Sequence, residues 1–459
     1  MGYSQQLSEK FGLASMIGFS CTIMITWEGI LFVYQYGMYD DGPLGSIIGY
    51  LFCWIGYTLV ALCLAEMNSM YPTEMAAGGQ YHWVSELAPE RIRRPLSYIT
   101  GWLLVLAWQA DLASAAYLGG TIIQGLVVLN YPSYEFHRWH GTLILYVVVI
   151  FAGIFNTVLI RFLPVAEGNV WDLFLNLGGY DSSGLSFFVG LIGPVFAFMG
   201  ADGANHMSEE CSNPRTTIPW ALVASITING VLGFGMLIAL LYCQGDISKN
   251  LSSSTGFPFI EAFLQSLRSV PWATAWTSLL LVLLIFANVA VMAATSRTTY
   301  AFARDNGLPF SNYIGHLHER TKLPLWAIAL TVVVTMLLGL INIGSWTAFN
   351  AVISLVVSAY YSSYFNAIIL LVWRKLSGTA PEPGPWHLGK TTRLVVNIVA
   401  LVYIVIVFIF SFFPIAIPVT LTSMNWAVVL YFGVVLIGVV LYLIRGKHFR
   451  EPRMMYERP

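Results

Sequence analysis

The feature that most constrains this chain is a series of apolar runs, each about 20 residues long, that recur along almost all of it. A helix of that length spans the hydrocarbon core of a membrane. With 57% hydrophobic and only 10% charged residues, the chain is far more apolar than a soluble domain. The sequence therefore predicts an all-helical polytopic integral membrane protein. Its predicted spans are residues 13–36, 43–66, 97–125, 140–160, 186–204, 219–243, 272–296, 324–344, 347–373, 394–413 and 425–444.

Motifs for metal, cofactor or nucleotide chemistry are not found in the sequence. The five cysteines are scattered without a CxxC pair, and no Walker motif or nucleophile constellation is present. We therefore expect no metal, no cofactor, no nucleic-acid partner and no enzymatic activity.

The basic residues predict an orientation. All but three of the 22 Lys and Arg residues can be placed in cytoplasmic segments, the exceptions being Arg138, Lys249 and Arg268. This puts residues 1–12 and the tail 446–459 in the cytoplasm, on either side of a transporter domain at 13–445. We expect contact with membrane lipid and a plasma-membrane location.

The same assignment exposes a conflict in the number of crossings. Arg161 ends the fourth predicted helix in the cytoplasm, and the next helix, 186–204, must also end there. Residues 162–185 would have to cross once more, yet they hold about half the apolar residues that a span needs. We interpret this as a missing crossing; the alternative is that one half of the chain is inverted.

A polar stretch interrupts the apolar pattern at residues 193–210, GPVFAFMGADGANHMSEE. It begins as a membrane helix and then places several Gly and polar residues at membrane depth. Such a break is tolerated only where it faces protein or a water-filled cavity. It is therefore a candidate binding site.

Three motifs resemble the amino acid, polyamine and organocation transporter superfamily, especially its fungal permeases for amino acids, 4-aminobutyrate (GABA) and choline. They are residues 65–83 (AEMNSMYPTEMAAGGQYHW), 195–219 (VFAFMGADGANHMSEECSNPRTTIP) and 296–309 (SRTTYAFARDNGLP).

The resemblance implies a leucine-transporter-type fold, with two inverted five-helix repeats, two extra helices, and substrate held where helices 1 and 6 unwind. The repeats would be about 13–168, incomplete, and about 186–374, with the extra helices at 394–445. The chain departs from that pattern at two places: a fifth helix is lacking near Glu167, and Glu74 to Ala76 resemble an insertion.

The function implied is secondary active transport of an amino acid or small amine such as GABA or choline, by alternating access and coupled to protons. The alternative is a transport-inactive truncated variant that acts as a sensor or assembly partner. Neither the substrate nor the oligomeric state can be read from the sequence.

The first half of the expected site lies in CTIMITWEG, residues 21–29. Glu28 would attract an amine or quaternary ammonium group, and Trp27 offers a cation–π face. The alternative is that Glu28 hydrogen-bonds another helix. The substrate-binding residues proposed here are Thr22, Ile23, Thr26, Trp27, Glu28 and Gly29.

The second half resembles the unwound helix 6. If helical bonding stops near Gly200, the carbonyls from Phe196 to Met199 become free to accept from an ammonium group. Lipid-facing Phe side chains are the alternative. The candidates here are Phe196, Ala197, Phe198, Met199 and Gly200.

Four groups are candidates for ion coupling: Glu28, Asp111, Asp202 and His206. Asp202 and His206 are four residues apart on one helical face, so they could pair or relay a proton. Asp111 lies amid small residues, where a hydrogen bond to a neighbouring helix is the alternative role. Glu209 and Glu210, followed by Pro214 and Arg215, are expected to be cytoplasmic gate and loop residues. Arg297, Arg304 and Asp305 end another predicted helix in the cytoplasm and are expected to act in topology and gating.

Overall fold

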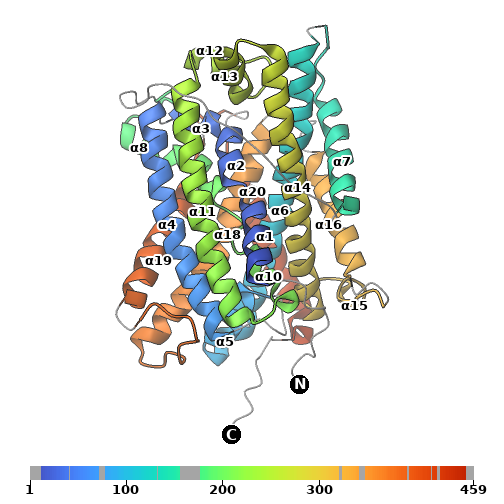
Figure 1. Ribbon diagram of the computed structural model, residues 1–459. Coiled ribbons are helices and arrows are strands. Elements are labelled where there is room, and N and C mark those ends of the chain that lie inside the picture. Colours follow the sequence, from blue (N-terminus) through green and yellow to red (C-terminus); the bar gives the residue numbers. More distant parts are fainter. Residues whose placement is uncertain are drawn as a thin grey trace.

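A computed structural model describes residues 12–40, 42–71, 78–131, 133–155, 176–319, 323–340, 347–389, 392–414, 416–420 and 424–450. These residues form a bundle of long, roughly parallel and antiparallel helices joined by short segments (Figure 1).

The described residues contain eight helices that are long and apolar enough to cross a membrane, together with three shorter apolar helices. They occupy the positions predicted from the apolar runs. The membrane helices are α1 (Leu13–Met24), α2 (Thr26–Phe32), α3 (Tyr34–Asp40), α4 (Gly42–Met70), α6 (Glu90–Asn130), α7 (Arg138–Phe155), α8 (Ser183–Gly190), α9 (Ile192–Ala197), α10 (Gly203–His206), α11 (Pro214–Cys243), α14 (Val270–Arg304), α16 (Leu325–Gly339), α18 (Thr347–Leu376), α19 (Thr392–Phe410) and α20 (Ala427–Arg445). The chain is a polytopic helical membrane protein.

Short helices mark the two ends of the bundle. We call one the α5 end, where α5 (Gln80–Leu87) and α15 (Ser311–Ile314) lie, and the other the α12 end, with α12 (Ile247–Leu251) and α13 (Pro258–Leu267) (Figure 1). The short 3₁₀ helices η1 (Ser208–Glu210) and η2 (Gly446–His448) complete the described elements.

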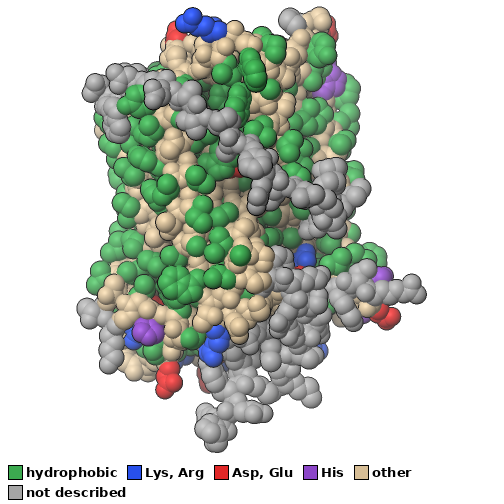
Figure 2. Space-filling model, viewed as in Figure 1, with side chains coloured by type: hydrophobic (Ala, Val, Ile, Leu, Met, Phe, Trp, Pro, Cys, Tyr) green, Lys and Arg blue, Asp and Glu red, His purple; other side chains and the backbone are tan. Residues whose placement is uncertain are grey.

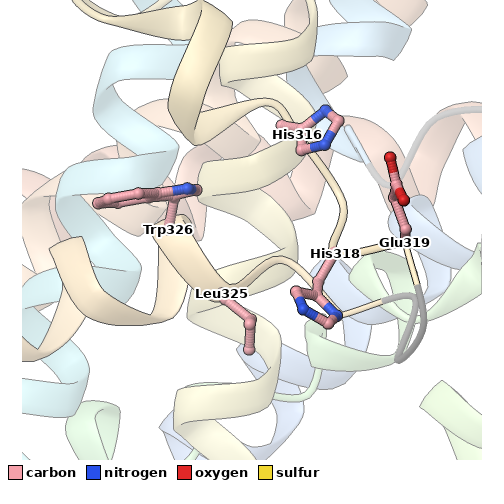
Figure 3. A pocket seen from close by; sticks show the side chains of 5 residues that line it. All are labelled: His316, His318, Glu319, Leu325 and Trp326. Carbon is pink, nitrogen blue, oxygen red and sulfur yellow. The ribbon is translucent and has the colours of Figure 1, made fainter.

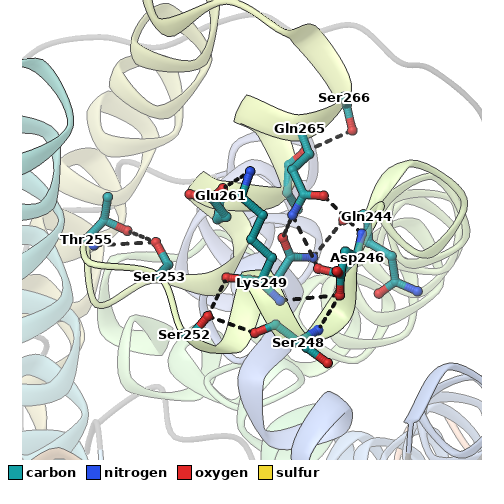
Figure 4. A network of polar contacts seen from close by, with 12 residues as sticks. Gln244, Asp246, Ser248, Lys249, Ser252, Ser253, Thr255, Glu261, Gln265 and Ser266 are labelled. Atoms are coloured by element: carbon teal, nitrogen blue, oxygen red, sulfur yellow. Dashed lines mark hydrogen bonds and ion pairs between the residues drawn. The ribbon is translucent and has the colours of Figure 1, made fainter.

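The α12 end is held by a polar network (Figure 4). Asp246 caps α12 by accepting from the amides of Ser248 at 2.9 Å and Lys249 at 3.4 Å. Lys249 Nζ pairs with Glu261 Oε1 of α13 at 3.3 Å, and the lysine side chain is 62% exposed.

The long helix α6 is the centre of the bundle. It packs against α5, α7, α14, α16, α18 and α20. Its 41 residues make it about 60 Å long, about twice the thickness of a bilayer core. On the outside, α19 and α20 leave apolar side chains such as Val402 and Leu436 exposed, as lipid contact requires. Hydrophobic side chains cover the middle of the face in Figure 2, and the visible charged groups lie mainly toward its ends.

Residues 71–95, which join the second and third predicted spans, are largely helical where they are described. They contain α5 and the first turn of α6, which continues through Pro95. Pro95 is the sixth residue of α6, so it removes the amide that would donate to the Arg91 carbonyl in a regular helix. Glu74 to Ala76 lie outside the described residues.

The proposed missing crossing also lies outside the described residues, which resume at Asn176. The described residues before and after this stretch can be placed relative to the two ends of the bundle. Arg138 begins α7 near the α12 end, and the Leu177 amide donates to Tyr39 O of α3 at 2.8 Å. Because α3 packs against α12 and α13, the chain resumes at the end from which α7 started.

Candidate functional site: two broken helices

The first membrane helix is interrupted between α1 and α2. Ile25 adopts a left-handed conformation, with φ 38° and ψ 37°. This conformation is strained for a β-branched residue, so the surrounding packing must hold it. No described backbone carbonyl accepts from the amides of Thr26, Trp27 or Glu28. The break therefore leaves the Thr26 and Trp27 amides without a backbone acceptor among the described residues, whereas the Glu28 amide interacts with its own carboxylate.

The second interruption lies between α9 and α10. Helical structure stops at Ala197, the chain turns through residues 198–202, and Gly200 takes φ +89°. One expectation needs correction: the Phe196 carbonyl is not free, because it accepts from the Met199 amide at 3.1 Å in a tight turn. The carbonyls of Ala197, Phe198 and Met199 have no backbone donor among the described residues.

The two breaks lie against each other. A Cβ atom on Gly200 would lie 2.5 Å from Ile23 Cγ2, and one on Gly203 would lie 2.5 Å from Ile23 Cδ1. A Cβ atom on Gly29 of α2 would lie 3.5 Å from Ala197. Glycine is required where φ is positive and another helix approaches so closely. The structure therefore brings together segments about 170 residues apart in sequence.

Glu28 is buried at this junction, with 5% of its surface exposed. Its Oε2 atom has no hydrogen-bond partner in the described part of the chain. The alternative role, a hydrogen bond to another helix, is thus not seen for this oxygen. Trp27 and Thr26 are also buried, whereas Thr22 is half-buried and donates to Gly18 O of its own helix at 2.8 Å.

Aromatic rings surround the second break. Phe196 and Phe198 are both buried, so the alternative of lipid-facing side chains is wrong. The Phe198 ring lies 5.0 Å from Tyr50 and 6.4 Å from Tyr57, both on α4. Met199 is buried as well. The junction is therefore lined by aromatic and sulfur side chains, which suit a cation or an apolar body.

Asp202 and His206 contact each other at the end of the break. His206 Nε2 lies 3.5 Å from Asp202 Oδ2, and both side chains are fully buried. Gln80 Nε2 of α5 donates to the same oxygen at 2.7 Å. A carboxylate, an imidazole and an amide thus meet in one place.

Asp111, on α6, lies near Asp202 and His206 but contacts a different residue. Tyr360 Oη of α18 donates to Asp111 Oδ2 at 3.2 Å, which is the hydrogen bond to a neighbouring helix considered as the alternative. The Trp108 ring lies 5.3 Å from Tyr360, which contacts Asp111, and 5.4 Å from His206, which contacts Asp202. Asp111 is therefore near the Asp202 pair without touching it.

Two ion pairs fasten the chain beyond the second break to α14. Arg304 Nη2 lies 2.9 Å from Glu209 Oε1, and Arg297 Nε lies 3.0 Å from Glu210 Oε1. All four side chains are buried, so each carboxylate depends on its arginine.

A separate pocket of about 360 Å³ lies beside α15 and α16 at the α5 end (Figure 3). His316, His318 and Glu319 supply polar groups to it, and Leu325 and Trp326 supply an apolar wall. None of these residues belongs to either break.

Three contacting residues were missed by the sequence-based prediction: Gln80, Trp108 and Tyr360. Gln80 lies within a motif that carried the resemblance, but nothing in a one-dimensional pattern links it to an acid 122 residues away. Trp108 and Tyr360 look like ordinary helix residues in the sequence, and only the fold brings Tyr360 to Asp111 and Trp108 to His206.

Two discontinuous helices that meet inside a polytopic bundle define a class of protein: a membrane carrier. The family models agree. One described as amino acid permease matches residues 165–435, more than half of the chain, and another with that description matches residues 25–167. The chain belongs to the amino acid permease family, and so is a transporter rather than an enzyme.

Similar proteins come mainly from fungi. A Macrophomina phaseolina protein named as an amino acid/polyamine transporter is 32% identical, over 90% of this chain and 96% of its own. The choline transporter of Saccharomyces cerevisiae is 28% identical, over 96% and 82%. An amino-acid permease of Neurospora crassa is 26% identical, over 98% and 87%.

Proposed function

We propose that this permease transports a small amine or amino acid, such as choline or GABA, by alternating access, and that a proton gradient drives the transport. The α5 end would face the cytoplasm of a cell whose plasma membrane holds the protein. The observation that carries the proposal is the buried Glu28 carboxylate at the junction of the two broken helices, with Oε2 lacking a hydrogen-bond partner among the described residues.

The chemistry of this carboxylate favours a cationic substrate group. A buried carboxylate is unstable unless a cation, a proton or hydrogen-bond donors compensate it. An ammonium group would supply the missing charge, and Trp27 and Phe198 lie on the two segments that meet there. The similarity to a choline transporter supports this substrate class.

Proton coupling is supported by the acids beside the site. Asp202 and His206 contact each other, and Asp111 lies near them in the protein interior. Ionisable groups inside a membrane bundle commonly mark ion pathways. We infer that one of these groups binds the coupled proton.

The test is uptake by transporter-deficient yeast of labelled choline, GABA and a panel of amino acids, with and without a protonophore. We expect saturable uptake of at least one amine, reduced when the gradient collapses. Glu28→Gln should raise KM at least tenfold, because a charged contact contributes about 1.5–3 kcal/mol. Glu261→Gln on α13, far from the junction, is the matched control. Uptake by Glu28→Gln equal to wild type in KM and pH dependence would exclude the role of Glu28.

A transport-inactive sensor or assembly partner is the second candidate, and one observation favours it. The two family matches meet at residues 165–167, within the stretch where a crossing is proposed to be missing. Sequencing the transcript across the codons for Glu167 to Trp171 would reveal an omitted exon. If the encoded chain is complete and the folded surface protein takes up none of the labelled compounds, the second candidate replaces the first.

A further inference from the structure

The start of α5 lies directly against the second broken helix. Gly79 holds φ +50°, and a Cβ atom there would lie 3.0 Å from His206 Cε1. A bulkier residue could not approach the imidazole in this way. The motif at residues 65–83 therefore places the next residue, Gln80, beside His206 and Asp202.

Gln80 orients the Asp202 carboxylate. Its Nε2 atom donates to Asp202 Oδ2 at 2.7 Å, and the same oxygen lies 3.5 Å from His206 Nε2. Gln80, Asp202 and His206 are all fully buried. Asp202 Oδ1 has no hydrogen-bond partner within the described segments, so Oδ2 carries the contacts seen there.

Tyr81, the adjacent residue, connects α5 to other helices and not to Asp202. Its hydroxyl donates to Asp305 Oδ2 at 2.9 Å, just beyond α14, and its carbonyl accepts from Ser97 Oγ of α6 at 2.9 Å. Gln80 and Tyr81 thus make separate contacts from one helix. This separation gives a matched control.

We propose that Gln80 is a positioning residue of the transport cycle, one that fixes the Asp202 carboxylate against His206 and so links the protonation of this pair to the position of α5. The proposal rests on the function proposed above. A hydrogen bond to an ionised carboxylate is stronger than one to a neutral acid. Proton binding at the pair would therefore weaken the Gln80 contact and loosen α5.

Other groups also influence Asp202 and must be considered in a pH measurement. The titratable groups that contact it or interact with it electrostatically are His206 from α10, Asp111 from α6, Tyr57 from α4, and Tyr360 and Tyr364 from α18. Gln80 is neutral and its Nε2 atom lies 2.7 Å from Asp202 Oδ2. Replacing Gln80 by Glu therefore introduces a titratable group next to the Asp202 carboxylate.

The first test is the pH profile of uptake. Gln80→Glu would place a second carboxyl group within hydrogen-bond distance of Asp202, and two such groups share a proton. We expect the midpoint of the profile to move at least one pH unit upward. Gln80→Leu should lower the maximal rate at least tenfold with KM changed less than threefold, and Tyr81→Phe should leave the midpoint in place. A Gln80→Glu profile that superimposes on wild type, at equal surface abundance, overturns the proposal.

The second test needs no transport. Ser85 of α5 is buried, so Ser85→Cys should react slowly with a water-soluble maleimide. Adding Gln80→Leu should raise the rate at least fivefold over Ser85→Cys alone, after subtraction of labelling at the native cysteines. An unchanged rate would overturn the link between Gln80 and α5. If wild type takes up no substrate, the proposed function fails, and the labelling rate still decides the role of Gln80.

Discussion

At the scale of single residues, the candidate site depends on two backbone conformations that helices do not adopt. Ile25 is held with a positive φ despite its branched side chain, and Gly200 has φ +89°. The strain at Ile25 costs about 1–3 kcal/mol, which the packing around it must offset. Gly200 avoids that cost because it has no Cβ. The two breaks therefore tolerate substitution differently.

Gly200→Ala should damage the protein. The new methyl group would lie 2.5 Å from Ile23 Cγ2, and the positive φ would become strained. We expect a loss of about 2–4 kcal/mol of stability, together with loss of uptake. Thermal unfolding in detergent measures the first effect.

The control for this substitution is Gly18→Ala in α1. Gly18 has open space around its Cα, and alanine favours the helix. We expect it to leave stability unchanged or to raise it by about 0.5–1 kcal/mol. Equal melting temperatures for Gly200→Ala and wild type would show that the close approach to Ile23 is unimportant.

At the scale of elements, the short helices, α5 among them, are the parts of the fold that the apolar pattern did not predict. The long apolar helices follow from composition, because only helices of about 20 residues satisfy their backbone in lipid. The eight residues of α5 carry no such signal. The breaks could be located from Gly and polar residues in 193–210 and from Glu28. The contact between Gln80 and the second break depends on tertiary packing, which the local sequence pattern does not show. The same is true of the tight turn in which the Phe196 carbonyl accepts from Met199.

His82 should make the stability of α5 depend on pH. Burial lowers the pKa of His82 to about 4, from an ordinary value near 6.5, and neither ring nitrogen has a partner in the described residues. The unfolded chain therefore binds the proton more tightly. Stability should be highest above about pH 6.5 and fall by up to about 3 kcal/mol as the pH drops toward 4.

Melting temperatures at pH 7.5, 6.0 and 5.0 test this. His82→Phe should flatten the dependence, since a buried aromatic ring that cannot be protonated takes its place. His387→Gln, at an exposed position in the segment after α18, should leave the dependence as in wild type. A wild-type curve that does not fall below pH 6.5 would contradict the prediction.

At the scale of the whole molecule, the two ends of the bundle are fastened differently. At the α5 end, Lys375 Nζ lies 2.7 Å from Glu66 Oε2 and also donates to Asn397 Oδ1 at 2.7 Å, with the lysine side chain only 6% exposed. At the α12 end, the Lys249 side chain that pairs with Glu261 is 62% exposed, although Glu261 itself is only 13% exposed. The buried contacts join α4, α18 and α19, so the α5 end is the more tightly held.

Removing one lysine from each end should reveal this difference. Lys375→Met removes the nearer of the two cations beside the buried Glu66 carboxylate and leaves Arg393 Nη1 at 3.8 Å from Oε1. We expect a loss of about 1.5–3 kcal/mol, the contribution of a hydrogen bond to a charged group. Lys249→Met should cost about 0–1 kcal/mol, because exposed pairs contribute little. Chemical or thermal unfolding of both variants provides the comparison. Similar losses at the two positions would show that burial of the pair does not matter.

The ion pairs beyond the second break also have a consequence for synthesis of the chain. Glu209 leaves the ribosome about 95 residues before Arg304, its partner on α14. At about 5–20 residues per second, the two glutamates of η1 wait about 5–20 s for their arginines. During that interval the segment α8 to α10 is short, polar at its end and without the charges that neutralise it. The turn beyond the second break can therefore make these buried contacts only after α14 has been synthesised.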